Sequence, residues 1–238
     1  LADHLAGAAG RVVRFGGTDD CELRVSGIAA DGDGVRFDVN GAAHRVALPG
    51  EHNARNAAAA LAVAKAMNVD ERLAAAALAT ATGPPMRLAV QRVGRGVIIN
   101  DAYNANPESM AAALRTLAAW PGDAGRSRVA IIGDMLELGD DSPSLHREVG
   151  DFIAQLDGID RVFTVGRYAM FTAAALARHW PGGERVTAYA AWQDDLPGVI
   201  AAQLRGDEVV LVKASRGMAL ERLLPSIIEC MSRKDAPA

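Results

Sequence analysis

The sequence predicts an α/β protein whose larger part is a mainly parallel sheet with helices on both faces. From residue 84 onward, short apolar and β-branched stretches alternate with helical stretches, which is the pattern of parallel strands joined by helices. Before residue 84, short β stretches separated by turns are followed by two Ala-rich helical stretches. We therefore expect two domains, residues 1–83 and 84–238, with the boundary at Gly83-Pro-Pro85.

The first domain begins with a β-rich region. Strands are predicted at residues 11–15, 22–26, 35–39 and 44–48, paired mostly antiparallel, and Asn40-Gly41 favours a two-residue hairpin turn. Helices follow at residues 53–67 and 71–80 because Ala and Leu dominate there. Residues 1–6 have a helical pattern without a cap, so we expect the chain to be part of a longer one.

The second domain repeats strand and helix in turn. Strands are predicted at residues 88–93, 96–100, 128–132, 161–165, 185–189 and 208–212. Helices are predicted at residues 107–119, 142–156, 168–179, 193–204 and 218–230. Ligands of such sheets bind beyond the carboxyl ends of the strands, so polar motifs that directly follow strands are the candidates for a site.

Composition excludes several classes of protein. The 238 residues carry a net charge of −4 without a Lys/Arg stripe, which argues against nucleic-acid binding. Cys21 and Cys230 fit neither a metal site nor a disulfide framework, so we expect a reducing, cytoplasmic location. No apolar run is long enough for membrane insertion. We expect a monomer.

The first motif is Gly50-Glu-His-Asn53, with Asn56 three residues later at the start of a helix. Two amides on one helical face, beside the free N–H groups of the first turn, could bind a polar ligand such as a purine edge. Alternatively, Asn53 caps the helix and His52 packs beneath it.

The second motif follows the strand at residues 96–100. Asp101, Tyr103, Asn104 and Asn106 lie in one loop, and Pro107 suits the first position of the next helix with Asn106 as its cap. Asp101 could accept hydrogen bonds from a ribose or orient a cation, and Tyr103 offers a flat face with a polar tip. Turn formation alone explains Asn106, but it does not explain Tyr103.

The third motif, Gly133-Asp134 with His146 downstream, is a weaker signal. Gly-Asp turns follow many parallel strands, and His146 could equally be a satisfied surface histidine.

The fourth motif places Lys213, Ser215 and Arg216 directly after a buried strand and before the last predicted helix. Two cations and a hydroxyl there suit carboxylate or phosphate oxygens. A solvated basic turn is less consistent, because cations oppose the positive end of a helix dipole, so an anion is expected nearby. Arg87, at the domain junction, is a further candidate, although a lone Arg there often forms a surface ion pair.

Several common catalytic motifs do not occur. The sequence lacks G-x-x-x-x-G-K-[ST], G-x-G-x-x-G, H-E-x-x-H and G-x-S-x-G. Dehydrogenase, metalloprotease and esterase activities are therefore not supported, and no metal site is expected within the chain.

Taken in order, the four motifs and Arg87 resemble the Mur ligases of peptidoglycan synthesis. The segments that carry the resemblance are Gly50-Glu-His-Asn53 with Asn56, Asp101-Ala-Tyr-Asn-Ala-Asn-Pro107, Gly133-Asp-Met-Leu-Glu-Leu-Gly139 with His146, and Lys213-Ala-Ser-Arg216. The Tyr-Asn-Ala-Asn-Pro loop is the most specific of them. It is similar to the loop of the family members that add D-alanyl-D-alanine to a UDP-N-acetylmuramoyl-tripeptide. Ala214 departs from the family, which usually has Gly there, and its methyl group could disturb the approach of the amino substrate.

The resemblance implies an ATP-dependent ligase that forms an amide bond. It implies that residues 1–83 are the end of the central ATP-binding domain and that residues 84–238 are the Rossmann-like C-terminal domain. The P-loop and the Mg²⁺ ligands would lie upstream, so this chain alone would be inactive. Asn53 and Asn56 would flank the adenine, and Arg87 and Asp101 would hold the nucleotide. Loop residues Tyr103, Asn104 and Asn106 would line the cleft, and Lys213, Ser215 and Arg216 would act on the dipeptide or the acyl phosphate.

Two alternatives remain open at the level of sequence. One is a non-catalytic module that binds a nucleotide or an amino acid. The other is a Mur ligase that acts on a different amino substrate, such as diaminopimelate or lysine.

Overall fold

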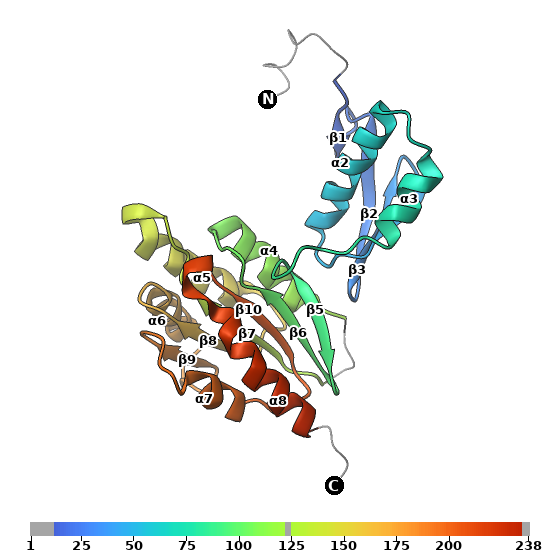
Figure 1. Ribbon diagram of the computed structural model, residues 1–238. Coiled ribbons are helices and arrows are strands. Elements are labelled where there is room, and N and C mark those ends of the chain that lie inside the picture. The colour runs from blue at the N-terminus through green and yellow to red at the C-terminus, as the bar shows by residue number, and fades with distance from the viewer. Residues whose placement is uncertain (1–11, 122–124, 235–238) are drawn as a thin grey trace. The chain divides into compact units, whose positions relative to one another are not determined.

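The computed structural model describes residues 12–121 and 125–234 of the chain (Figure 1). It divides into two compact units, Leu1–Thr82 and Gly83–Ala238. None of the described helices is long and apolar enough to cross a membrane.

The first unit contains a four-stranded sheet in the order β1-β2-β3-β4. The strands are β1 (Phe15–Gly16), β2 (Leu23–Asp31), β3 (Gly34–Val39) and β4 (Ala42–Val46). Strands β2, β3 and β4 pair antiparallel, and the predicted turn at Asn40-Gly41 is confirmed, since these residues have left-handed φ values of 51° and 83°.

The predicted strand at residues 11–15 is largely wrong. Residues 12–14 are not in a strand, and β1 is only two residues long and pairs parallel to β2. β1 starts at Phe15, later than predicted, and ends at Gly16, where a second glycine follows and glycine weakens strands. Arg11 and the predicted helical pattern at residues 1–6 lie outside the described residues.

Two helices cover this sheet, α2 (His52–Ala66) and α3 (Glu71–Ala79). The buried face of α2 carries mostly small side chains, which lets the helix lie close to the strands. Its residues are Ala54, Ala57, Ala58, Leu61 and Ala62. Asp70 caps α3 by accepting hydrogen bonds from the backbone N–H groups of Arg72 and Leu73.

The second unit is built on a six-stranded sheet in the order β5-β6-β10-β7-β8-β9. The strands are β5 (Ala89–Val93), β6 (Gly96–Asp101), β7 (Arg128–Gly133), β8 (Arg161–Val165), β9 (Val186–Tyr189) and β10 (Val209–Lys213). All neighbouring pairs are parallel except β5 with β6, so the predicted mainly parallel α/β fold is confirmed.

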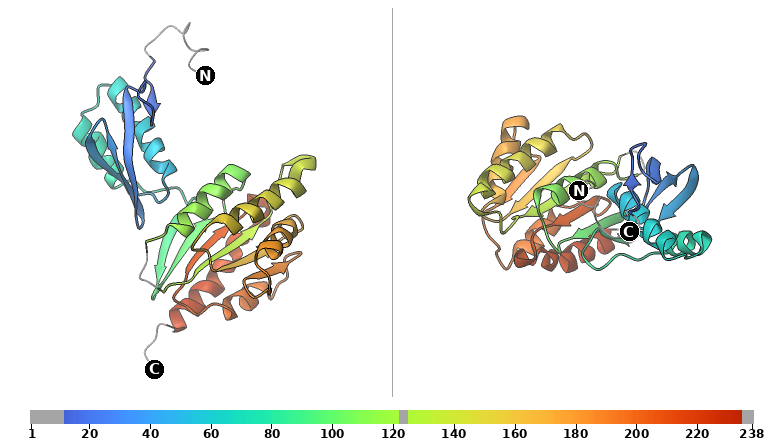
Figure 2. Two further views of the ribbon diagram at one scale, coloured as in Figure 1. Left: turned by 180° about the vertical axis from the view of Figure 1, so that it is seen from behind. Right: turned by 90° about the horizontal axis from the view of Figure 1, so that it is seen from above.

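Helices cover both faces of this sheet (Figures 1 and 2). Helices α4 (Pro107–Ala118), α5 (Ser142–Gln155) and α6 (Ala169–His179) pack on the face that includes Ile99, Ile132 and Leu211. Helices α7 (Leu196–Ala202) and α8 (Leu224–Lys234) pack on the opposite face, which includes Ile98 and Val212. Adjacent residues of one strand thus pack into different cores, because successive side chains of a strand point to opposite faces of the sheet.

The strand order creates a switch point at β10. The chain passes from β6 to β7, continues outward to β8 and β9, and returns to insert β10 between β6 and β7. Ligands of open α/β sheets bind beyond the carboxyl ends of strands at such a point. The loops after β6, β7 and β10 are therefore the expected site region.

The helix predicted at residues 218–230 begins later than expected. Residues Arg216–Met218 and Leu220–Leu223 form two short 3-10 turns, and α8 begins at Leu224 with Pro225 in its first turn. Lys213 and Arg216 therefore do not lie at the start of an α-helix, so the dipole argument made from the sequence does not apply to them.

Candidate functional site

The ends of β6 and β10 bring Asp101 and Lys213 together. These residues are register partners on adjacent parallel strands, and the Lys213 ammonium donates to Asp101 Oδ2 at 2.6 Å. The same ammonium donates to the Asn104 backbone oxygen at 3.0 Å, while Asp101 Oδ1 accepts from the Leu88 backbone N–H at 3.0 Å. This pair therefore ties the loop after β6 to β10 and to the residues before β5.

The Lys213 side chain is buried, with 1% of its surface exposed. Burial lowers the pKa of Lys213 below its ordinary value of 10.5, and the positive charge of Arg87 lowers it further, whereas Asp101 opposes both. The solvated-turn interpretation of Lys213 is therefore wrong. The anion that pairs with Lys213 is the Asp101 carboxylate.

Arg87 lies between two residues with left-handed backbone. Met86 has a φ of 62° and Leu88 a φ of 50°, which is unusual for side chains of this size. Hydrogen bonds hold both residues: the Met86 oxygen accepts from the Tyr103 N–H at 3.1 Å, and the Leu88 N–H reaches Asp101. The Arg87 guanidinium carbon lies 4.4 Å from the centroid of the Tyr103 ring, a cation–π contact.

Asn104 and Asn106 have different positions in the loop after β6. Asn104 is exposed, and its Oδ1 accepts from the Ala105 N–H. Asn106 caps α4 in a capping box, because its side chain accepts from the Ser109 N–H while the Ser109 hydroxyl accepts from the Asn106 N–H. The cap that the sequence predicted for Asn106 is confirmed.

Ser215 is buried and joins three segments. Its hydroxyl accepts from the Leu136 N–H at 2.8 Å and donates to the Ala105 oxygen at 3.3 Å. The Ser215 backbone N–H donates to the Asp134 backbone oxygen at 3.0 Å. Ser215 therefore connects the loops after β6, β7 and β10.

Arg216, unlike Ser215, presents its charge to solvent, with 58% of its side chain exposed. It forms an ion pair with Glu221, and the same guanidinium lies 4.0 Å from the Met86 sulfur. Glu221 was not singled out from the sequence. Arg216 and Glu221 lie in two successive 3-10 turns, and a spacing of five residues is not a helical signal for such a pair.

In the third motif, Asp134 makes hydrogen bonds within the chain that hold the start of α6. The buried Asp134 carboxylate accepts from the N–H groups of Tyr168 and Ala169, at the start of α6. His146 is 1% exposed, so it is not a surface histidine. Its pKa is lowered, chiefly by burial, and its Nε2 accepts from the Met135 N–H at 3.0 Å.

The Ala214 methyl group does not reach the surface. Ala214 is fully buried, and its Cβ would lie 2.8 Å from a Cβ added to Gly133 on the neighbouring strand. The alanine at residue 214 is therefore accommodated directly after β10, beside Gly133.

Asn53 and Asn56 lie in the first turns of α2 in the first unit, where Asn53 is half-buried and Asn56 is exposed. The Asn56 amide donates to Asn53 Oδ1 at 3.0 Å, and the Asn53 amide donates to the Pro49 oxygen at 2.7 Å. The alternative in which Asn53 caps the helix is wrong, because Glu51 is the N-cap residue and makes no side-chain cap hydrogen bond.

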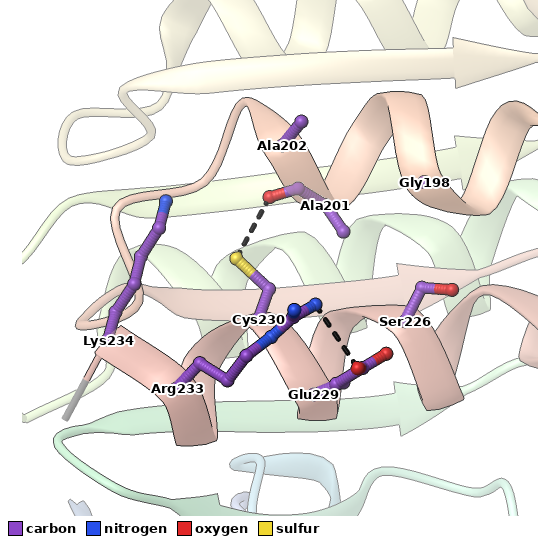
Figure 3. Close-up of a pocket in the computed structure, with 8 residues that line it drawn as sticks. All are labelled: Gly198, Ala201, Ala202, Ser226, Glu229, Cys230, Arg233 and Lys234. Carbon is purple, nitrogen blue, oxygen red and sulfur yellow. Dashed lines mark hydrogen bonds and ion pairs between the residues drawn. The ribbon is translucent and has the colours of Figure 1, made fainter. Parts of the chain in front are cut away.

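A separate cavity of about 330 Å³ lies between α7 and α8 (Figure 3). Gly198, Ala201 and Ala202 line one side, and residues of α8 that include Cys230 line the other. None of the predicted site residues lines it. Among the residues that the structure describes, no group of three or more His, Cys, Asp or Glu side chains could hold a metal ion.

The second unit therefore carries one polar surface beyond the carboxyl ends of β6 and β10. Arg87, Tyr103, Asn104 and Arg216 are exposed there, above the buried Lys213–Asp101 pair. The Arg87 guanidinium lies over the Tyr103 ring, and the Arg216 guanidinium lies beside Met86, the residue before Arg87. Two cations and an aromatic ring at this edge suit an anionic, partly planar ligand. We call this surface the carboxyl-edge surface.

Comparisons with known proteins point to one family. The profile of a family described as "Mur ligase, glutamate ligase domain" matches residues 86–216. The UDP-N-acetylmuramoyl-tripeptide–D-alanyl-D-alanine ligase of Bacillus subtilis is 36% identical over 211 residues, which cover 87% of this chain and 45% of the relative. The ligase of the same name from Escherichia coli is 37% identical over 185 residues, which cover 76% of this chain and 38% of the relative.

A solved structure matches as well. A crystal structure of MurF from Acinetobacter baumannii superimposes with a TM-score of 0.78 and 27% identity, covering 92% of this chain and 47% of that chain. The chain thus spans less than half the length of these relatives.

Proposed function

The chain belongs to the Mur ligase family, and from this premise we propose that it supplies the carboxy-terminal part of an ATP-dependent ligase. The proposed reaction joins D-alanyl-D-alanine to a UDP-N-acetylmuramoyl-tripeptide in peptidoglycan synthesis, in the cytoplasm. The relatives that carry this activity in their names support the choice of substrates. The proposed domains are residues 1–83, the end of a central ATP-binding domain, and residues 84–238, a C-terminal domain.

In the proposed reaction, ATP transfers its γ-phosphoryl group to the terminal carboxylate of the tripeptide, which gives an acyl phosphate and releases ADP. The amine of D-alanyl-D-alanine then attacks the acyl phosphate, and the tetrahedral intermediate collapses to an amide and phosphate. Both steps build negative charge on oxygens, and preorganised cations stabilise such charge. The observation that carries the proposal is the meeting of Arg87, Arg216 and the Lys213–Asp101 pair at one edge of the sheet.

We propose distinct roles for the exposed and the buried residues. Arg216 contacts the dipeptide carboxylate or the acyl phosphate, exchanging its ion pair with Glu221 for the substrate anion. Arg87, Tyr103 and Asn104 contact the nucleotide.

Lys213 and Ser215, whose polar atoms are hydrogen-bonded within the chain, keep these loops in place, as do Asp101 and Asn106. Asn53 and Asn56 read the adenine from the first unit, and we propose that the enzyme is a monomer.

Mg²⁺ would neutralise the phosphates of ATP in this chemistry. The described residues offer no cluster for it, so we propose that its ligands and the P-loop lie in another part of the full-length ligase.

A phosphate-release assay tests the proposed function. With Mg-ATP, tripeptide substrate and D-alanyl-D-alanine, the 238-residue chain alone is expected to release no phosphate above background. The full-length ligase is expected to release phosphate only when both peptide substrates are present. Turnover by the chain alone would contradict the proposed division of labour. A preference for diaminopimelate or lysine over the dipeptide would contradict the proposed amino substrate.

A further inference from the structure

The segment Asp134–Leu138, which follows β7 and which we call the β7 loop, offers two consecutive backbone N–H groups to side chains. Met135 donates to His146 Nε2 at 3.0 Å, and Leu136 donates to the Ser215 hydroxyl at 2.8 Å. Glu137, the next residue, has a left-handed φ of 65°. Because this backbone is unfavourable for a glutamate, the loop needs its hydrogen bonds to keep this shape.

The two partners of the His146 ring fix its tautomer. Nε2 accepts the Met135 N–H, so it carries no proton, and Nδ1 lies 2.7 Å from the Ser142 oxygen, to which it must donate. The buried ring also faces the Tyr168 ring, with centroids 5.7 Å apart, and the Asp134 carboxylate is the charged group near it. The Met135 N–H is therefore held by a neutral imidazole with its proton on Nδ1.

The adjacent N–H completes a connection to the carboxyl-edge surface. The Leu136 N–H occupies the acceptor side of the Ser215 hydroxyl, which leaves its proton for the Ala105 oxygen at 3.3 Å. Ala105 lies in the loop that carries Tyr103 and Asn104, and Ser215 precedes Arg216 directly. A shift of the β7 loop would therefore change the position of both flanking loops.

We propose that His146 is a positioning residue of the carboxyl-edge surface: its neutral imidazole holds the β7 loop in place, so that Ser215 keeps the loops after β6 and β10 in register. His146 acts through Met135 and Leu136 and touches no substrate. The inference depends on the proposed function only in that it assigns these loops to substrate binding.

Two substitutions separate the two sides of the ring. His146→Asn keeps a donor at the level of Nδ1 and loses the acceptor at Nε2, whereas His146→Gln keeps an acceptor at the level of Nε2. Thr172→Val is the matched control, because it removes a buried hydrogen bond from the Thr172 hydroxyl to the His146 backbone oxygen, at 2.7 Å, and leaves the ring intact.

Amide hydrogen exchange of the 238-residue chain, followed by NMR, is the first measurement. After correction for global stability, His146→Asn is expected to speed exchange at Met135 and Leu136 about tenfold, the scale of one lost buried hydrogen bond. His146→Gln is expected to restore most of the protection, and Thr172→Val to leave these two amides unchanged. Unchanged exchange in His146→Asn, or equal loss in Thr172→Val, would overturn the proposal.

Steady-state kinetics of the full-length ligase is the second measurement. His146→Asn is expected to raise KM for the dipeptide or lower kcat, His146→Gln to recover the lost activity, and Thr172→Val to change neither constant. If His146→Asn and Thr172→Val have the same kinetics, the positioning role is refuted even if the ligase is active. If the unmodified ligase does not use the dipeptide, the proposed function fails, and the exchange experiment still decides whether His146 holds the β7 loop.

Discussion

Asp101→Asn is a sharp test of the buried ion pair, because an amide cannot replace this carboxylate. Both Asp101 oxygens accept hydrogen bonds, one from the Lys213 ammonium and one from the Leu88 N–H. An Asn side chain has one oxygen, so in either orientation its NH₂ group would face one of these donors. The substitution therefore removes the compensating charge and one acceptor together.

The expected cost follows from the burial of Lys213. Removing one partner of a buried ion pair costs about 3 to 5 kcal/mol, because the remaining charge is left uncompensated. Lys213 keeps the Asn104 oxygen as an acceptor at 3.0 Å, so we expect the lower end, about 3 kcal/mol. All three tryptophans, Trp120, Trp180 and Trp192, lie in the second unit, so tryptophan fluorescence during urea unfolding reports on this unit.

The pH dependence supplies a second readout. Burial already lowers the pKa of Lys213, and loss of Asp101 removes the charge that opposes this shift, so the folded variant releases the Lys213 proton at a lower pH than the unfolded chain does. Stability rises with pH wherever the unfolded state binds more protons. The loss caused by Asp101→Asn should therefore shrink between neutral pH and 10.5, the ordinary pKa of Lys213.

Lys213→Met combined with Asp101→Asn is the control. Without the ammonium, the Asn oxygen can face the Leu88 N–H, so the double variant should lose less than the sum of the single losses, by about 2 kcal/mol. Additive losses, or a loss from Asp101→Asn that does not change with alkaline pH, would refute the reasoning.

Three further predictions follow from local geometry. Gly133→Ala should lower the unfolding free energy by about 2 kcal/mol because its Cβ would meet the Ala214 methyl at 2.8 Å, and Ala214→Gly should recover part of that loss in the same urea assay. Asn106→Ala removes the cap of α4 and should cost about 1 kcal/mol, whereas an unchanged urea midpoint would argue against the capping box. The pKa of His146 is lowered below 6.5, so the unfolded chain binds its proton first on acidification. Stability should therefore fall as pH drops through 6.5, and less steeply in His146→Gln, which a series of urea unfolding curves between pH 5 and 7 would measure.

Much of the second unit follows from its sequence, because the apolar runs are short and strongly periodic. The strand at residues 161–165 was predicted with its observed bounds, and the expected loops after β6 and β10 lie at neighbouring strand ends. The start of α8 was placed too early, although Pro225 was available as a signal for the first turn of a helix.

Other features depend on tertiary contacts and could not be read from the sequence. The left-handed backbone at Met86 and Leu88 could not be predicted, because neither residue is a glycine. Hydrogen bonds to residues 13 or more positions away in the sequence hold this backbone. The pairing of Arg216 with Glu221 likewise depends on how loops pack, because its spacing is not that of a regular helix or strand. The burial of His146 did have a signal in the sequence, since Val149, Gly150 and Ile153 follow it at helical spacing on the buried face of α5.

The most direct test of the account is the activity of the full-length ligase with Arg216→Ala, compared with Arg233→Ala as the control. Arg233 is an exposed arginine near the end of α8 that lines the separate cavity. If the carboxyl-edge surface binds the reacting groups, Arg216→Ala should lower kcat/KM for dipeptide-dependent phosphate release about 100-fold, and Arg233→Ala should leave it unchanged. Equal activities of the two variants would contradict the placement of the site at this edge.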